Sequence, residues 1–109
     1  MTRYLISFPS DAMDHIPDEE MPDVAKASHA VVRGAQAAGV WIFGGGLDED
    51  VEPVVVAGDG TVTTGTYPVG GVTIVDVPTR KAALEWAAKI AVACRCAQEV
   101  SEFMFDPLV

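Results

Sequence analysis

The order of strand-like and helix-like segments restricts the fold of this 109-residue chain more than any single motif does. Helical spacing of apolar residues predicts one helix from near Pro22 to a cap at Gly39, and a second from an N-cap at Thr79 to Cys94. We therefore expect a single domain over residues 1–109. Apolar runs that alternate or are rich in β-branched residues predict strands over residues 3–8, 40–43, 53–57, 61–64, 72–77 and 98–105.

The strands at 53–57 and 61–64 flank the sequence Gly58-Asp59-Gly60, which is typical of a tight hairpin. Without this extra short hairpin the segments follow the order βαββαβ, which predicts an α+β, ferredoxin-like fold with an antiparallel sheet. The strand at 40–43 is apolar on both faces, which favours a central position in the sheet. Because helices cover only one face of such a sheet, we expect a homodimer in which two sheets meet face to face.

The charge balance argues against two classes of partner. Lys and Arg number 7 and Asp and Glu number 16, and the net charge of −9 disfavours both nucleic acid and anionic membrane surfaces. No apolar run approaches the roughly 20 residues of a membrane span, and the apolar stretch that Pro9 ends is too short for a signal peptide. The spacing of Cys94 and Cys96 rarely permits a disulfide, and free thiols indicate a cytoplasmic protein.

His29 is the main candidate for chemistry. A neutral imidazole titrates near pH 7 and is a competent general base. On the helical wheel His29 lies at the border of the polar face, a position that suits the rim of a pocket and suits solvent equally. The alternative, an exposed helix histidine without a partner, therefore stays open.

Three consecutive glycines, Gly44 to Gly46, follow the second strand. They lead into an acidic loop rather than a helix, which disfavours phosphate binding. We interpret Gly45 and Gly46 as a place where a ligand approaches the backbone, or as a bulge. Tyr67, in the loop after the hairpin, is the aromatic side chain most readily exposed to a ligand, with its hydroxyl as a donor.

The sequence gives only weak indications of a metal site or a redox site. His15 stands among carboxylates, and residues 48–52 hold four acids, but neither stretch has the spacing of a known cation site. We expect solvated loops there, with no metal and no cofactor. Cys94 continues the apolar face of the second helix, which predicts a structural thiol.

Several stretches together resemble the YCII-related family and its DGPF branch, over nearly the whole chain. Two departures concern the pocket: Thr64 and Thr66-Tyr67 flank Gly65 where the Asp-Gly-Pro-Phe signature is expected, and Gly46 replaces a Pro. The stretches that carry the resemblance are Tyr4-Leu5-Ile6, His29 in the first helix, Gly39 through Leu47, Thr63 through Tyr67, Gly70 through Val77, and Ala82 through Ala87.

The resemblance implies a dimeric α/β barrel with a cleft between the sheet and the loops of each subunit. It also implies an acidic partner for His29 after the second strand, here Asp48. Among the reactions known for such proteins is a dehalogenating or lyase-type step on an aromatic compound. The DGPF branch often accompanies sigma factors of the extracytoplasmic type, which implies a regulatory role for some members.

Three functions remain open. The first is a cofactor-free lyase or hydrolase in which His29, oriented by Asp48, acts on a small cyclic or aromatic compound held near Gly45, Gly46 and Tyr67. The second is a non-catalytic ligand-binding or regulatory dimeric module associated with a sigma factor. The third is an assembly unit whose apolar second helix serves only oligomerisation.

Overall fold

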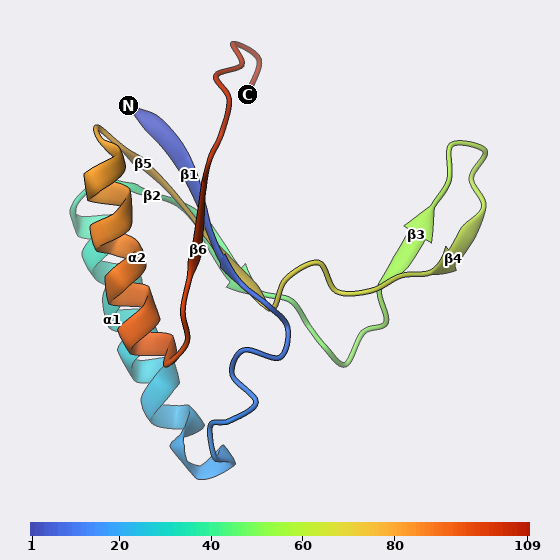
Figure 1. The fold of residues 1–109 in the computed structure, drawn as a ribbon, viewed down its shortest axis with the longest axis horizontal. Helices are drawn as coiled ribbons and strands as arrows, with labels where there is room; N and C mark the ends of the chain where they lie inside the picture. Colours follow the sequence, from blue (N-terminus) through green and yellow to red (C-terminus); the bar gives the residue numbers. More distant parts are fainter.

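The computed structural model describes residues 1–109. Figure 1 shows two helices on one face of a sheet, with a hairpin and the C-terminal tail extending away from the body. The elements are β1 (Thr2–Phe8), the 3-10 turn η1 (Asp18–Glu20), α1 (Met21–Ala37), β2 (Trp41–Gly46), β3 (Val54–Val56), β4 (Val62–Thr64), β5 (Gly71–Val77), α2 (Arg80–Cys94) and β6 (Glu99–Glu102).

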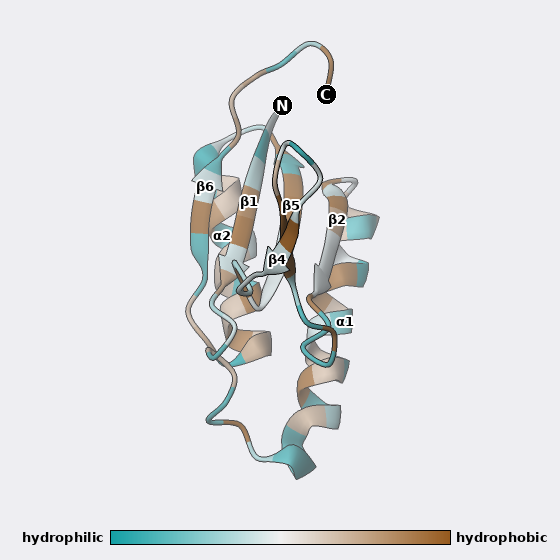
Figure 2. Cartoon of the chain, turned by 90° about the vertical axis from the view of Figure 1, so that its right-hand side faces the viewer, coloured by the Kyte–Doolittle hydropathy of each residue, from teal (hydrophilic) through white to brown (hydrophobic).

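The main sheet has four antiparallel strands in the order β2-β5-β1-β6. With α1 between β1 and β2, and α2 between β5 and β6, this is the ferredoxin-like arrangement, and the predicted α+β fold is confirmed. Both helices cover the same face of the sheet (Figures 1 and 2). The opposite face, which we call the open face, has no helix over it.

The core lies between the helices and the covered face of the sheet. Side chains of a strand alternate between its two faces, and the buried apolar ones on β1 and β5 point toward the helices. Only 14 of the 109 residues are buried, so this core is small for the length of the chain. The residues that form it are Tyr4, Ile6, Ala35, Val40, Val75, Val77, Ala83, Ala87 and Ile90.

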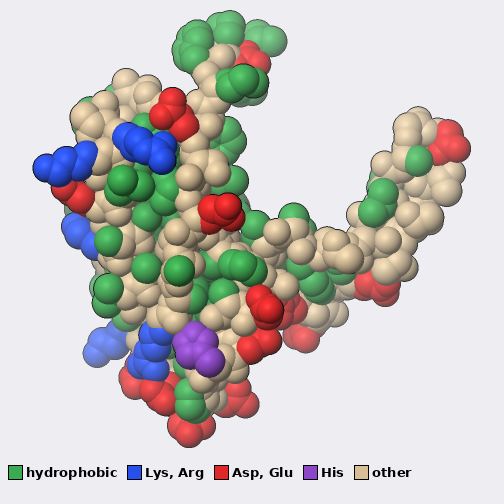
Figure 3. Space-filling view, in the orientation of Figure 1, with side chains coloured by type: hydrophobic (Ala, Val, Ile, Leu, Met, Phe, Trp, Pro, Cys, Tyr) green, Lys and Arg blue, Asp and Glu red, His purple; other side chains and the backbone are tan.

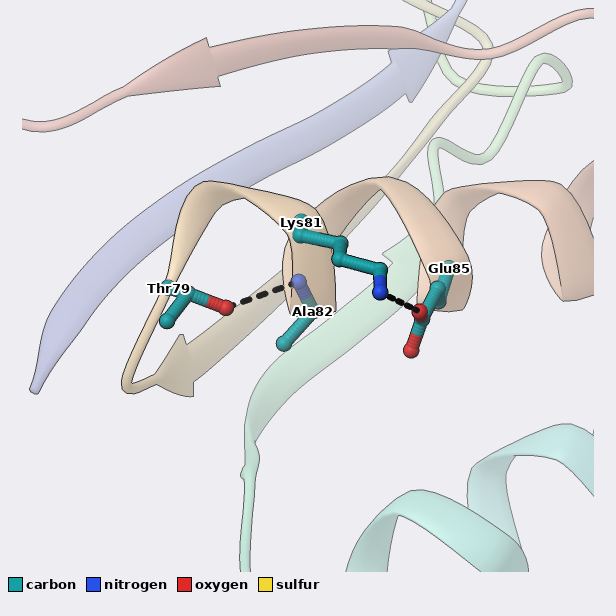
Figure 4. A network of polar contacts seen from close by, with 4 residues as sticks. All are labelled: Thr79, Lys81, Ala82 and Glu85. Carbon is teal, nitrogen blue, oxygen red and sulfur yellow. Dashed lines mark hydrogen bonds and ion pairs between the residues drawn. The ribbon is translucent and has the colours of Figure 1, made fainter.

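The ends of both helices follow local sequence signals. Pro22 lies in the first turn of α1, and Gly39, with φ of +74°, follows the helix as predicted. The side chain of Thr79 accepts a 3.1 Å hydrogen bond from a backbone N–H in the first turn of α2 (Figure 4). Arg95 ends α2 in the left-handed region, and its guanidinium pairs with Glu20 at 2.5 Å, which ties the end of α2 to the start of α1.

β2 is an edge strand, so the predicted central position of residues 40–43 is wrong. Trp41 is paired with Val75 and faces the helices, whereas the register then shifts across a bulge. Ile42 and Phe43, at and after the bulge, are 40% and 61% exposed. The apolar run therefore marks a strand with one covered and one exposed apolar face, rather than a strand buried on both.

The predicted hairpin is present as a separate two-stranded sheet of β3 and β4, which projects from the body (Figure 1). Gly60, with φ of +89°, supplies the backbone conformation that its turn requires. β6 ends at Glu102, which pairs with Tyr4 of β1, rather than at the predicted residue 105. Residues 103–109 form an exposed tail.

Candidate functional site

A cavity of about 460 Å³ lies between α1, the end of α2 and the β2–β5 edge of the sheet. Its wall is mostly apolar, with side chains from every surrounding element. A cavity of this size and character is typical of small-molecule sites. The apolar side chains include those of Phe8, Met13, Met21, Val24, Val31, Val32, Trp41, Val75, Trp86 and Ile90.

The glycines of β2 shape one wall of this cavity. A Cβ on Gly44 would overlap the ring of Trp41 and lie 3.0 Å from the carbonyl oxygen of Val72, so the indole folds over a strand that has no side chain there. A Cβ on Gly45 would meet nothing within 4 Å. The structure brings Gly45 and Gly46 to the same cavity as His29.

Four polar side chains line the cavity: Ser28, His29, Thr73 and Cys94. The Ser28 hydroxyl donates a 3.0 Å hydrogen bond to a carbonyl oxygen one turn earlier in α1, so its lone pairs remain available to a ligand. His29 is exposed at the rim and forms no ion pair with any carboxylate of the chain. No Asp, Glu, Lys or Arg lines the cavity, which therefore suits an uncharged ligand.

The structure does not bring Asp48 to this cavity. Asp48 follows the end of β2, and its carboxylate accepts a 3.0 Å hydrogen bond from the backbone N–H of Asp50. The backbone N–H of Val51 also donates to the Asp48 carbonyl oxygen, at 3.2 Å, and closes the turn. His29 consequently has no carboxylate to fix the orientation of its ring.

Tyr67 lies in a different hollow, formed by the acidic loop and the base of the hairpin. Its hydroxyl donates to the carbonyl oxygen of Val51 at 2.6 Å and lies 3.0 Å from that of Glu49. Burial of the ring raises the pKa of Tyr67, and the carboxylates of the acidic loop, Glu49 first, raise it further. Tyr67 thus holds the loop in place rather than facing the cavity of His29.

No group of three His, Cys, Asp or Glu side chains lies close enough together to hold a metal ion. His15 is exposed and lies outside the cavity. The carboxylates of residues 48–52 lie in an exposed loop, where only one carboxylate oxygen, Oδ1 of Asp48, accepts a hydrogen bond.

Cys94 and Cys96 are free thiols, as predicted. Cys94 packs against the core and also lines the cavity. Burial raises the pKa of the Cys94 thiol, and the neighbouring Cys96 adds to the effect. At neutral pH this side chain is a thiol rather than a thiolate, which suits a packing role and not that of a nucleophile.

Ser28 and Thr73 line the cavity but were not predicted as site residues. Ser28 occupies a position in the apolar stripe of α1. Thr73 lies on the covered face of β5, the same face as the buried Val75 and Val77. The sequence signal that could have identified both residues is a polar residue at an inward-facing position of an apolar pattern.

Residues 4–103 match the model of the YCII-related domain. No curated protein matches the chain in a sequence search. Neither helix is long and apolar enough to cross a membrane. The matched residues take in both helices and nearly all of the main sheet, in the strand order described above, and the chain belongs to the YCII-related family.

Proposed function

We propose that the chain is a cytoplasmic, homodimeric pocket protein that binds a small cyclic or aromatic compound in the cavity beside α1. In this proposal it is a cofactor-free lyase or hydrolase, and His29 is its general base. The position of His29 carries the proposal: it stands in the wall of a mostly apolar cavity of about 460 Å³. No other side chain in that wall has an ordinary pKa near neutral pH.

The lining supports a ring compound as the ligand. Trp41 and Trp86 contribute aromatic surfaces, which pack well against flat rings. At Gly45 no side chain stands between the backbone and an approaching molecule. The lack of charged residues in the wall disfavours an ionic substrate, which would lose its hydration without gaining a partner.

The chemistry proposed is proton transfer at the rim of an apolar cavity. The neutral imidazole of His29 accepts a proton from the bound compound or from a water molecule beside it, and later returns that proton. Asp48 would orient the imidazole only after leaving the turn in which it accepts a hydrogen bond from Asp50. Gly45 and Gly46 would contact the compound where they line the cavity, whereas Tyr67 would reach it only after leaving its hydrogen bonds to the acidic loop.

One observation favours a second function, ligand binding without turnover in a regulatory module such as one associated with a sigma factor. The Asp48 carboxylate is engaged with Asp50, and no carboxylate pairs with His29. An imidazole without such a partner can still donate a hydrogen bond to a ligand or accept one from it. This function predicts saturable binding of a compound that is recovered unchanged.

Tryptophan fluorescence tests both functions, because both tryptophans of the chain line the cavity. The protein is titrated with phenol, catechol and cyclohexenone, and each mixture is then examined for products by mass spectrometry. We expect saturable quenching by at least one compound and conversion of that compound. His29→Gln should abolish conversion, whereas His15→Gln, a change at the histidine outside the cavity, should not.

The outcomes separate the two functions. Saturable quenching with the compound recovered intact supports the binding module and contradicts catalysis by His29. Conversion that persists in His29→Gln contradicts the general base. If no ring compound quenches the fluorescence, the cavity is not a site for this class of ligand.

A further inference from the structure

Exposed large apolar side chains gather on the side of the sheet that carries no helix. They fall in three segments: β2 and the loop after it, the β3–β4 hairpin, and the tail after β6. On the helices only Met21, Leu84 and Val92 are large, apolar and exposed. Figure 3 shows hydrophobic side chains along the hairpin and the tail. Such a concentration on one side of a molecule is typical of an interface.

The hairpin carries an apolar face of its own. We call residues 53–65 the arm. The strand register places Val54, Val56 and Val62 on one face of the arm, where they are 59%, 63% and 58% exposed. A two-stranded ribbon with an uncovered apolar face is marginally stable in water and needs a surface to pack against. The body of its own chain does not provide that surface, because all three valines of this face are more than half exposed.

The arm and the tail stand on the same side of the molecule. Figures 1 and 2 show the arm leaving one end of the sheet and the tail leaving the other, both toward the open face. The radius of gyration of 15.5 Å exceeds the value of about 13 Å for a compact chain of this length. The two projections therefore frame the open face.

The surface area is larger than a compact monomer of this mass would have. The chain exposes 7346 Å², against about 5,800 Å² for a typical 11.5 kDa monomer. The excess is on the order of 1,500 Å² for each chain, which is above the roughly 800 Å² that each partner buries in a standard interface. Covering this excess would place the contact among large, obligate interfaces.

The charges of the open face fit a second copy of the same chain. Arg3 and Asp76 are direct partners in the register of β1 and β5, yet they form no ion pair. The Asp76 Oδ1 atom is buried and has no hydrogen-bond partner. A two-fold axis brings the same patch of each copy together, so Arg3 of one chain can reach Asp76 of another and the reverse. The face is therefore complementary to itself.

We propose that the arm reaches across to a second copy seated on the open face, and that the face formed by Val54, Val56 and Val62 packs against that copy. The inference rests on the homodimer of the proposed function, and is independent of the ligand and of His29. It assigns to the hairpin a role in assembly, in which each chain is held by the arm of the other.

Isotope-filtered NMR tests the inference directly. A mixture of ¹³C-valine-labelled and unlabelled full-length chains is allowed to exchange, and NOEs are recorded from labelled methyl groups to unlabelled protons. We expect intermolecular NOEs from Val54, Val56 and Val62. A dimer without such NOEs overturns the role of the arm while leaving the homodimer intact. A monomer at 10 µM by sedimentation equilibrium overturns both.

A variant supplies the matching measurement. The triple change Val54→Thr, Val56→Thr, Val62→Thr keeps β-branched residues in the strands while making the proposed contact polar. We expect at least a tenfold weaker dimer, whereas Val55→Thr on the other face of the arm should leave the dissociation constant within twofold. An equal loss in both overturns the assignment of the face. Binding of ring compounds, read separately by fluorescence, tells a failed dimer from a failed pocket.

Discussion

The Tyr4 hydroxyl donates a 2.9 Å hydrogen bond to the carboxylate of Glu102, the residue directly opposite it across β1 and β6. Tyr4 is 3% exposed, whereas Glu102 lies at the exposed end of β6. Burial raises the pKa of Tyr4, and the hydrogen bond and negative charge of Glu102 raise it further. The pair therefore joins an edge strand to the core through a group that must stay protonated.

This pair predicts a loss of stability in alkali. Because the pKa of Tyr4 in the folded protein is above 10.0, the folded state holds the proton more tightly than the unfolded state. The free energy of unfolding should fall as the pH rises from about 10 through the folded pKa. Urea unfolding between pH 9 and 11 should show a shallower fall in Tyr4→Phe. An identical slope in the variant would assign the alkaline loss to other groups.

The two neighbouring glycines of β2 predict opposite responses to alanine. Gly44→Ala places a methyl group into the Trp41 ring, and we expect a loss of about 1–3 kcal/mol from overpacking. Gly45→Ala meets open space and should change stability little. Urea unfolding measures both, and tryptophan fluorescence should shift only in Gly44→Ala. Equal losses would show that backbone freedom, rather than the ring contact, requires these glycines.

The cap of α2 predicts a graded loss. Thr79→Ala removes the side-chain acceptor for the Ala82 N–H (Figure 4) and should cost about 1 kcal/mol. Thr79→Ser retains the acceptor and should stay close to the wild type. The Lys81 Nζ and Glu85 Oε1 atoms in the same turn lie 4.0 Å apart, and the two side chains are 86% and 63% exposed. Because such a surface ion pair contributes little, Lys81→Ala should cost less than about 0.5 kcal/mol. Thermal unfolding ranks the three variants.

Burial of Cys94 predicts slow alkylation. Because its pKa is raised above 9.0, the thiolate fraction at pH 8 is smaller in the folded protein than in the unfolded chain. In Cys96→Ser, iodoacetamide should react many times more slowly without urea than with it, by mass spectrometry. A ring compound that fills the cavity should slow the reaction further, since Cys94 lines the wall. Equal rates in both states would contradict the burial.

Local patterns predicted most of the fold. The helix caps at Gly39 and Thr79 and the turn at Gly60 depend on neighbouring residues, and each lies where the sequence indicated. The place of β2 at the edge was missed because it depends on pairing with β5 alone, a contact between strands far apart in the sequence. Apolar side chains also serve exposed surfaces, so a run of them does not identify a central strand.

Only some of the predicted site residues lie together in the structure. His29 shares a cavity with Gly45 and Gly46, because α1 packs directly against the edge formed by β2. Asp48 and Tyr67 stand apart from that cavity, since each is held by hydrogen bonds within the acidic loop. The turn at Asp48 is local, whereas Tyr67 bonds to carbonyl oxygens 16 and 18 residues away, a contact that no spacing in the sequence indicates.

The bulge in β2 allows one strand to contribute to both the cavity and the exterior of the molecule. On one side of Ile42 the strand presents Trp41 to the cavity, and on the other it presents Phe43 to the exterior. In a regular strand residues 41 and 43 would point to the same face, so the extra residue at the bulge is what allows Trp41 and Phe43 to point to opposite faces. A substitution at Phe43 can therefore change the exterior of the molecule without altering the cavity, and a substitution at Trp41 can change the cavity without altering the exterior.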